Sequence, residues 1–177
     1  MKTPNSNDGK APAYRSFEDL EVYKQARNFR MAMYRVAKRL PEIEKYGLAS
    51  QIRRAAVSLT NNLAEGHGRF HFLDQIKFTL ISRGSLEELI DDLNVCLDES
   101  YLSEQEVSDL KTTAWHVLRL TNGYLRYLRD RKFGSSLLLH EIPPSYNAGA
   151  IDDESMDWLE ELLNEHPELS PSRPTNH

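Results

Sequence analysis

The sequence of 177 residues contains one cysteine and no long apolar segment. Cys96 alone cannot form an intrachain disulfide or a cysteine zinc cluster. No segment approaches the about 20 consecutive apolar residues that a transmembrane helix requires, and residues 1–15 lack the apolar core of a signal peptide. We therefore expect a cytoplasmic protein without a membrane-spanning segment, in which Cys96 is a buried small hydrophobic residue.

The sequence also lacks the motifs of common active sites. It contains no glycine-rich phosphate loop, no HExxH and no serine-hydrolase elbow. His67 and His71 are four residues apart, but Gly66 and Gly68 interrupt the helix that would place both on one metal ion. No Glu-x-x-His pair of a di-metal bundle is present around His116. We predict no enzymatic activity, no cofactor and no metal site.

Apolar residues recur at steps of three and four through most of the chain, which predicts amphipathic helices and no strands. The expected helices run from near Phe17 to Leu40, from Tyr46 to Glu65, from Phe72 to Glu99, and from Ser103 to about Lys132. Ser16 with Asp19 and Ser103 with Glu106 are capping boxes, and Pro41 ends the first helix. Short connections favour an all-α, antiparallel up-down four-helix bundle over residues 16–132.

Small residues indicate how two of these helices pack. Gly66 and Gly68 are expected to end the second helix. Gly84-Ser85 lies inside the third helix, where glycine costs about 1 kcal/mol against alanine, and close packing against the second helix is expected to offset this cost. Ser58 and Asn62 are expected to hydrogen bond to backbone or to a neighbouring helix.

Charge is distributed unevenly along the chain, whose net charge is -5. Residues 22–41 hold six bases and no acid, and four of them share the helix face opposite the apolar stripe. Residues 84–110 hold nine acids and no base, and the four acids Glu87, Glu88, Asp91 and Asp92 indicate a solvated face rather than paired catalytic carboxylates. This acidic helix could instead face the basic one, within one chain or between subunits. Clustered bases such as those of residues 22–41 bind phosphates without reading the nucleotide sequence. The candidate nucleic-acid contacts are Lys24, Arg27, Arg35, Lys38, Arg53, Arg54 and Arg69, the last three extending the surface with Lys45 around one end of the bundle.

The ends of the chain have a different composition. Residues 1–15 are predicted to be a flexible arm. Residues 133–177 form an acidic tail with nine acids and one base, in which Asp152 or Asp153 is expected to cap a short amphipathic helix near 153–165. This helix has the form of a docking element, or it packs on its own bundle. The residues that would carry the docking are Met156, Trp158, Leu159, Leu162 and Leu163.

Several blocks between Phe17 and Arg129 resemble the four-helix-bundle family first known from proteins encoded within 23S rRNA intervening sequences. The matching blocks are Phe17-Glu18-Asp19-Leu20-Glu21-Val22-Tyr23, Leu40-Pro41-Glu42, Tyr46-Gly47-Leu48, Gln51-Ile52-Arg53-Arg54-Ala55-Ala56-Val57-Ser58-Leu59, Asn62-Leu63-Ala64-Glu65-Gly66, Gly68-Arg69 and Gly84-Ser85-Leu86-Glu87-Glu88-Leu89. The resemblance implies an up-down bundle, commonly assembled as a pentamer, with no known enzymatic activity. The acidic tail lies outside these blocks.

The same fold class includes the accessory variability determinant of diversity-generating retroelements, a basic pentamer that partners a reverse transcriptase and structured RNA. The resemblance therefore implies a homo-oligomer, with structured RNA or DNA and a reverse transcriptase as partners. We predict a non-catalytic nucleic-acid-binding accessory protein. The alternative is a protein-interaction scaffold, in which the acidic tail docks on a partner or on the basic face of the bundle. Arg53 and Arg54 could bind phosphate or pair with Glu87 or Glu88.

Overall fold

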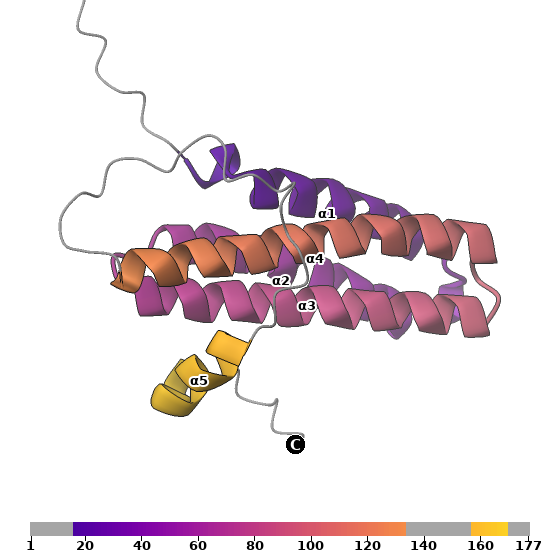
Figure 1. Ribbon diagram of the computed structural model, residues 1–177. Helices are drawn as coiled ribbons and strands as arrows, with labels where there is room; N and C mark the ends of the chain where they lie inside the picture. Colours follow the sequence, from indigo (N-terminus) through magenta and orange to yellow (C-terminus); the bar gives the residue numbers. More distant parts are fainter. Residues whose placement is uncertain (1–15, 134–156, 170–177) are drawn as a thin grey trace, which may run out of the picture.

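The computed structural model describes residues 16–133 and 157–169. The predicted N-terminal arm and part of the predicted acidic tail, including Asp152, Asp153 and Met156, lie outside these residues. Within them, four long helices form an antiparallel up-down bundle, as predicted (Figure 1). These helices are α1 (Glu21–Arg39), α2 (Leu48–His67), α3 (Phe72–Asp98) and α4 (Glu104–Phe133).

Each helix of the bundle packs against the two that neighbour it around the ring. Contacts join α1 to α2, α2 to α3, α3 to α4, and α4 back to α1. In this arrangement α1 and α3 occupy opposite corners, as Figure 1 shows. The alternative in which the acidic third helix faces the basic first helix within one chain is therefore wrong.

The polar capping signals lie where the sequence places them, with one change at the first helix. Ser16 and Asp19 form the predicted capping box, with the Ser16 amide donating to Asp19 Oδ2 at 3.0 Å. This box begins a short 3-10 helix, η1 (Phe17–Asp19), and α1 begins only at Glu21 because Leu20 is extended. At α4, the Glu106 amide donates to Ser103 Oγ at 3.3 Å and the Ser103 amide donates to Glu106 Oε2 at 3.2 Å.

The second helix is shifted toward the C-terminus relative to its prediction. It starts at Leu48, after η2 (Glu42–Glu44), and the Glu44 carboxylate accepts from the Leu48 amide at 3.0 Å. The prediction that Gly66 ends the helix is wrong, because Gly66 is buried inside α2 and Gly68 is the C-terminal cap. A β-carbon at Gly66 would lie 3.0 Å from Phe78 Cβ. Gly66 therefore lets α2 approach α3 closely.

Gly84 has the opposite environment from the predicted one. It is exposed on α3, and a β-carbon built there would meet no atom within 4 Å. The close approach of α2 to α3 occurs instead at Gly66, and polar contacts also join the two helices. Ser82 Oγ donates to the Leu59 carbonyl at 2.6 Å, and Ser85 Oγ donates to Ser58 Oγ at 2.8 Å.

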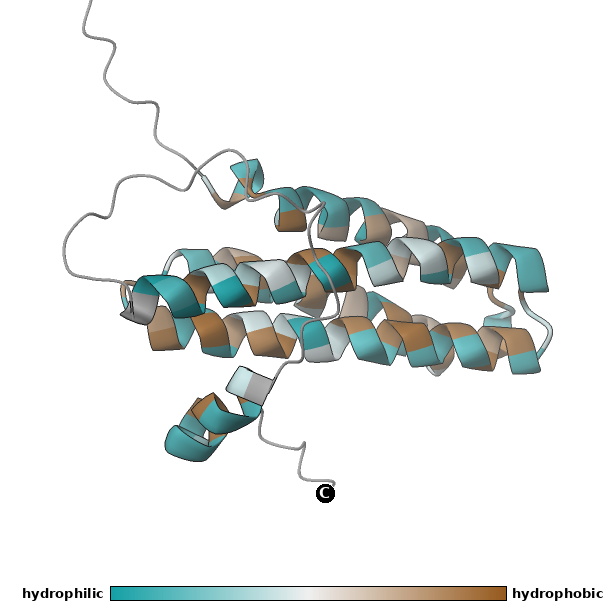
Figure 2. Cartoon of the chain, viewed as in Figure 1, coloured by the Kyte–Doolittle hydropathy of each residue, from teal (hydrophilic) through white to brown (hydrophobic). Residues whose placement is uncertain are grey.

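The described part of the tail forms α5 (Asp157–Glu165) and the 3-10 helix η3 (Pro167–Leu169). Leu162 and Leu169 are each 3% exposed and join the hydrophobic core of the bundle. α5 lies beside the end of the bundle where α3 begins and α4 ends (Figure 1), and η3 contacts α3. The outward turns of α5 are hydrophilic (Figure 2). The expected amphipathic helix is therefore present, and it packs on its own bundle.

Candidate nucleic-acid interface

The outer face of α1 carries the bases that the sequence groups together. The apolar stripe of α1, with Val22, Phe29 and Met33, is buried against α2 and α4. Because an α-helix has 3.6 residues per turn, the residues halfway around from this stripe point away from the bundle. Four exposed bases lie there around the 40% exposed side chain of Met31. These bases, which we call the α1 basic face, are Lys24, Arg27, Arg35 and Lys38.

The α1 basic face has no acidic partner in the described part of the chain. None of its four side chains forms an ion pair or a hydrogen bond with residues 16–133 or 157–169. The other two bases of this helix point to its flanks and are engaged. Arg30 donates to Thr60 Oγ1 of α2 at 2.7 Å, and Arg39 pairs with Glu106 of α4 at 2.7 Å.

The three candidate arginines outside α1 have partners within the chain. Arg53 donates to the Lys45 carbonyl at 3.0 Å. Arg54 pairs with Glu88 of α3 at 2.6 Å, which is the structural alternative considered for it. Arg69 pairs with Glu65, and its guanidinium lies 4.8 Å from the centre of the Phe78 ring.

These arginines also do not form one patch at one end of the bundle. Arg53 lies in the first turns of α2, and Arg69 follows its last turn. At 1.5 Å per residue they are about 24 Å apart along the helix axis. The predicted grouping around one end is therefore wrong, because α2 runs the length of the bundle between them.

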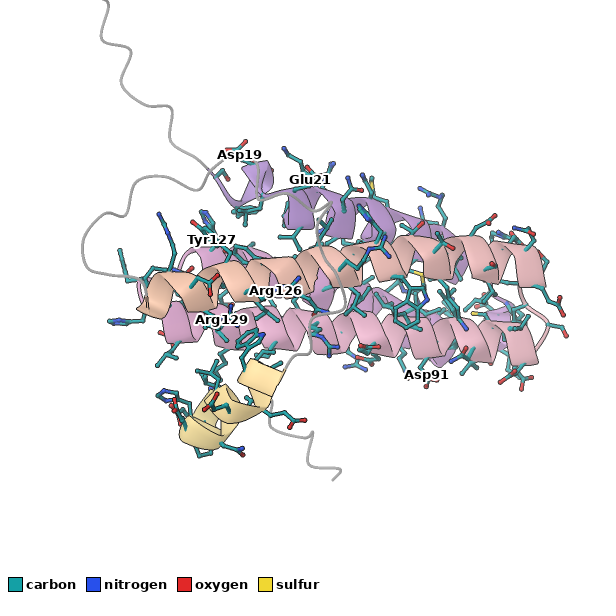
Figure 3. All side chains as sticks on the ribbon, in the orientation of Figure 1. Asp19, Glu21, Asp91, Arg126, Tyr127 and Arg129 are labelled. Atoms are coloured by element: carbon teal, nitrogen blue, oxygen red, sulfur yellow. The ribbon has the colours of Figure 1, made fainter. Side chains whose placement is uncertain are left out.

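Sequence reasoning missed a second group of bases on α4. Residues 119–132 contain five bases and one acid, Asp130. This excess of bases is the sequence signal by which the group could have been found. Figure 3 shows Arg126 and Arg129 from this stretch. Arg129 pairs with Asp130 at 2.7 Å, and its guanidinium lies 4.8 Å from the centre of the Trp158 ring of α5. Arg129 is therefore used to hold the tail, whereas Arg119 remains exposed beside His116.

The predicted docking residues lie mainly between the tail and the bundle. Leu162 is buried, Trp158, Leu159 and Leu163 are half-buried, and Met156 lies outside the described residues. The acidic segment 157–169 contacts α3 and Arg129 of α4. It leaves the α1 basic face uncovered, so the described tail does not compete for that face within one chain.

The acidic block divides into an exposed and a buried part. Asp91 points away from the bundle, on the side opposite Glu21 of α1 (Figure 3). Asp92 was expected on the solvated face, but it is 1% exposed because it lies between α2 and α3. Gln51 Nε2 donates to Asp92 Oδ1 at 2.9 Å, while Oδ2 has no hydrogen-bond partner among the described residues. Burial, reinforced by the nearby Glu88 carboxylate, raises the pKa of Asp92 to about 6.

The described residues offer no constellation for metal binding. Residues 16–133 and 157–169 contain no group of three or more His, Cys, Asp or Glu side chains placed to share a metal ion. His67 ends α2 and His71 precedes α3, so these two histidines do not share one helix. Cys96 is fully buried, as predicted, and burial raises the pKa of its thiol to about 11. None of the described helices has the length and hydropathy to cross a bilayer.

Comparison with known proteins relates this chain to a protein family and to solved structures with the same fold. The sequence pattern of the family described as 23S rRNA-intervening sequence protein matches residues 18–123. No curated protein matches the chain. A crystal structure of a protein of unknown function from the S23 ribosomal protein family of Bacteroides thetaiotaomicron superposes with a TM-score of 0.57 at 17% identity. The match covers 62% of this chain and 98% of that one, and at this identity it shows the fold alone.

Proposed function

Because the chain belongs to the 23S rRNA-intervening sequence protein family, we propose that it is a non-catalytic nucleic-acid-binding accessory protein. Its phosphate contacts lie on the α1 basic face. The observation that carries this proposal is the unpaired state of Lys24, Arg27, Arg35 and Lys38 within the described chain. Within the described residues neither α3 nor α5 covers these bases, since α3 lies at the opposite corner and α5 lies beside α3 and α4.

The dimensions of the face suit a nucleic-acid backbone. Lys24 and Lys38 are 14 residues apart, which corresponds to about 21 Å along the helix. Each strand of a duplex places a phosphate about every 3.4 Å along its axis, so several phosphates lie within reach of the four bases. The face contains no arrangement of side chains that selects a base. The proposed binding is therefore independent of sequence and relies on release of counterions.

A salt series with the full-length protein and a uridine homopolymer tests the proposal. Four phosphate contacts on a single strand predict a slope of log K against log salt of about -3. Neutralising one unpaired base, as in Arg27→Gln or Arg35→Gln, should lower the magnitude of this slope by about 0.7. Arg54→Gln is the comparison and should change the slope less, because Arg54 already pairs with Glu88. Absence of binding at low salt, or a slope near zero, would contradict the proposal.

Arg53, Arg54 and Arg69 have a smaller share in this proposal, since each already donates to an oxygen of the chain. The homo-oligomer, a pentamer, and the partnership with a reverse transcriptase belong to the same proposal and rest on the resemblance. A reverse transcriptase encoded beside this protein and purifying with it would support the retroelement role. A measured mass equal to that of one chain at all concentrations would contradict the oligomer.

The second candidate is a protein-interaction scaffold. The acidic outer surface of α5, where Glu160, Glu161 and Glu165 are exposed while Leu162 is buried, favours it. A partner would bind this acidic surface rather than the apolar side that packs on the bundle. Reversing Glu160 and Glu161 to lysine in the full chain would abolish binding of a protein partner under this alternative, and it would leave uridine-homopolymer binding intact or stronger.

A further inference from the structure

Trp115 is a large aromatic side chain that the bundle does not bury. It lies in the first half of α4, is 44% exposed, and is not among the residues that pack on the hydrophobic core. Within residues 16–133 and 157–169 its indole has no hydrogen bond and no contact with another ring or a cation. The other tryptophan, Trp158, is half-buried, and the Arg129 guanidinium lies over its ring. Trp115 therefore presents an open aromatic surface to solvent.

Two bases without acidic partners follow Trp115 on the same side of α4. Arg119 and Arg126 lie four and eleven residues after Trp115, which places all three within about 40° of one another around the helix. Arg119 contacts His116 Nδ1 at 3.4 Å, and neither Arg119 nor Arg126 (Figure 3) has an ion pair with the described residues. We call Trp115, Arg119 and Arg126 the α4 outer face.

Acidic residues and the described tail leave the α4 outer face open. Residues 110–129 contain four bases and no acid. The neighbouring helix α3 carries Glu87, but Arg83 pairs with it at 3.3 Å. α5 is held at Arg129, which lies about 21 Å beyond Trp115 along the helix. An open aromatic ring followed by unpaired bases fits a ligand that has both a flat π surface and negative charge. Because Trp115 and Arg126 are about 16 Å apart along α4, a chain of nucleotides spans the face better than a single nucleotide.

The α4 outer face lies at the same level of the bundle as the centre of the α1 basic face. α1 and α4 are antiparallel neighbours, and the ion pair between Arg39 and Glu106 sets their register. Met31, at the centre of the α1 basic face, lies eight residues before Arg39, and Trp115 lies nine residues after Glu106. Both are therefore about 12–14 Å from the ion pair along the bundle axis. A strand that crosses from α1 to α4 near the middle of the bundle passes Trp115.

We propose that Trp115 stacks on an unpaired nucleobase while Arg119 and Arg126 contact neighbouring phosphates, so that single strands gain a contact that a duplex cannot make. This inference rests on the proposed function, whose phosphate contacts do not distinguish the two. The bases of a duplex stack on each other, whereas every unpaired base offers a π face, so the contact adds affinity without reading sequence. Two further phosphate contacts make the salt slope steeper by about 1.4 for a strand that reaches both faces.

Three ligands of equal length test this inference on the full-length protein. They are a single-stranded deoxyadenosine oligonucleotide, the same sugar-phosphate chain without bases, and a deoxyadenosine–thymidine duplex, with affinities measured by fluorescence anisotropy at one salt concentration. The wild type should bind the oligonucleotide at least about fivefold more tightly than the abasic chain. Trp115→Ala should lose this preference and keep the wild-type affinity for the abasic chain and the duplex. Trp115→Phe should retain part of the preference, because phenylalanine also stacks.

Phe70→Ala is the matched control, because Phe70 is an 86% exposed aromatic residue whose loss also leaves the charge unchanged. It should bind all three ligands as the wild type does. A second measurement follows the indole itself. With Trp158→Phe in place, Trp115 is the sole tryptophan, and its fluorescence should be quenched by the oligonucleotide but not by the abasic chain. A purely structural role of Trp115 predicts instead that Trp115→Ala weakens binding of all three ligands alike.

Four results would overturn the inference. These are equal binding of the oligonucleotide and the abasic chain by the wild type, a preference that survives Trp115→Ala, an equal loss of all three ligands in that variant, and Trp115 fluorescence that does not respond to the oligonucleotide. A Trp115 covered by a protein partner or by another copy gives the first and the last of these. Failure of the proposed function gives a different pattern, in which none of the three ligands binds at low salt.

Discussion

At position 92 a carboxyl group lies between α2 and α3, and one of its oxygens has no hydrogen-bond partner in the described part of the chain. Its pKa is about 6 in the folded protein, against an ordinary value of 3.8, so the folded state holds the proton more tightly than the unfolded state. The resulting stabilisation is complete below about pH 4 and is lost as the pH rises through about 6. At neutral pH an ionised Asp92 therefore weakens the α2–α3 interface.

Asp92→Asn should stabilise the protein at neutral pH by up to about 3 kcal/mol, since a shift of one pKa unit corresponds to about 1.4 kcal/mol. The difference from the wild type should disappear as the pH falls toward about 4. Urea unfolding over this pH range measures both effects. Asp91→Asn, one residue away and exposed, is the control. Equal effects of the two substitutions would show that burial of Asp92 is not the cause.

Gly66 and Gly84 lie in helices, but their surroundings predict opposite effects of adding a methyl group. Gly84→Ala should stabilise the protein by about 0.5–1 kcal/mol, because the position is open and alanine has the higher helix propensity. Gly66→Ala should destabilise it by about 1–3 kcal/mol, because the new β-carbon would meet Phe78 Cβ at 3.0 Å and the Gln75 carbonyl at 3.3 Å. Thermal unfolding of both variants checks the prediction, and effects of the same sign would contradict it.

At the scale of elements, α5 is held on the bundle by only a few side chains of the described chain. Leu162 and Leu169 are buried, and Arg129 lies over Trp158. A cavity of about 270 Å³, lined by Arg129, Trp158, Glu161, Leu162 and Glu165, lies beside the helix, so its packing is incomplete. We expect α5 to open at a lower free energy than the four long helices.

Leu162→Ala should release α5 without unfolding the bundle, since removal of a buried leucine costs about 2–5 kcal/mol and the loss falls on one small contact. Hydrogen exchange should show lost protection in residues 157–169 and faster exchange in the first turns of α3. Leu163→Ala, at a half-buried position, provides a milder comparison. A uniform loss of protection through α1 to α4 would show that α5 is part of the cooperative bundle.

The elements themselves were largely predictable, because periodicity and caps are local properties. Ser103 and Glu106 cap α4 as the pattern indicates, and Pro41 follows the end of α1. The errors lie at glycines and at charges. Gly66 lies inside α2, where the close approach of α3 leaves little room for a side chain. Asp92 is buried because α2 covers it. Neither neighbour is visible in the sequence around the residue.

At the scale of the whole molecule, Cys96 reports on the integrity of the core. Its thiol is fully buried and its pKa is raised to about 11 by burial and by the nearby Asp92 and Glu44 carboxylates. The thiolate is the reactive form, so a thiol reagent should label the native protein only when the bundle opens. The labelling rate should therefore rise in urea in parallel with global unfolding. Rapid labelling in native buffer would show that the end of the bundle near Cys96 opens locally.

The sequence by itself determined that the protein is an all-α bundle, because hydrophobic periodicity and capping depend only on neighbouring residues along the chain. It also determined that six bases share one segment and nine acids another. Only the tertiary structure decided which charges of the described residues pair with one another. The up-down order puts α1 and α3 at opposite corners and seats α5 beside α3 and α4. Pairing of charges depends on distance in space, so Arg54 pairs with Glu88, while Lys24, Arg27, Arg35 and Lys38 have no ion pair or hydrogen bond with residues 16–133 or 157–169.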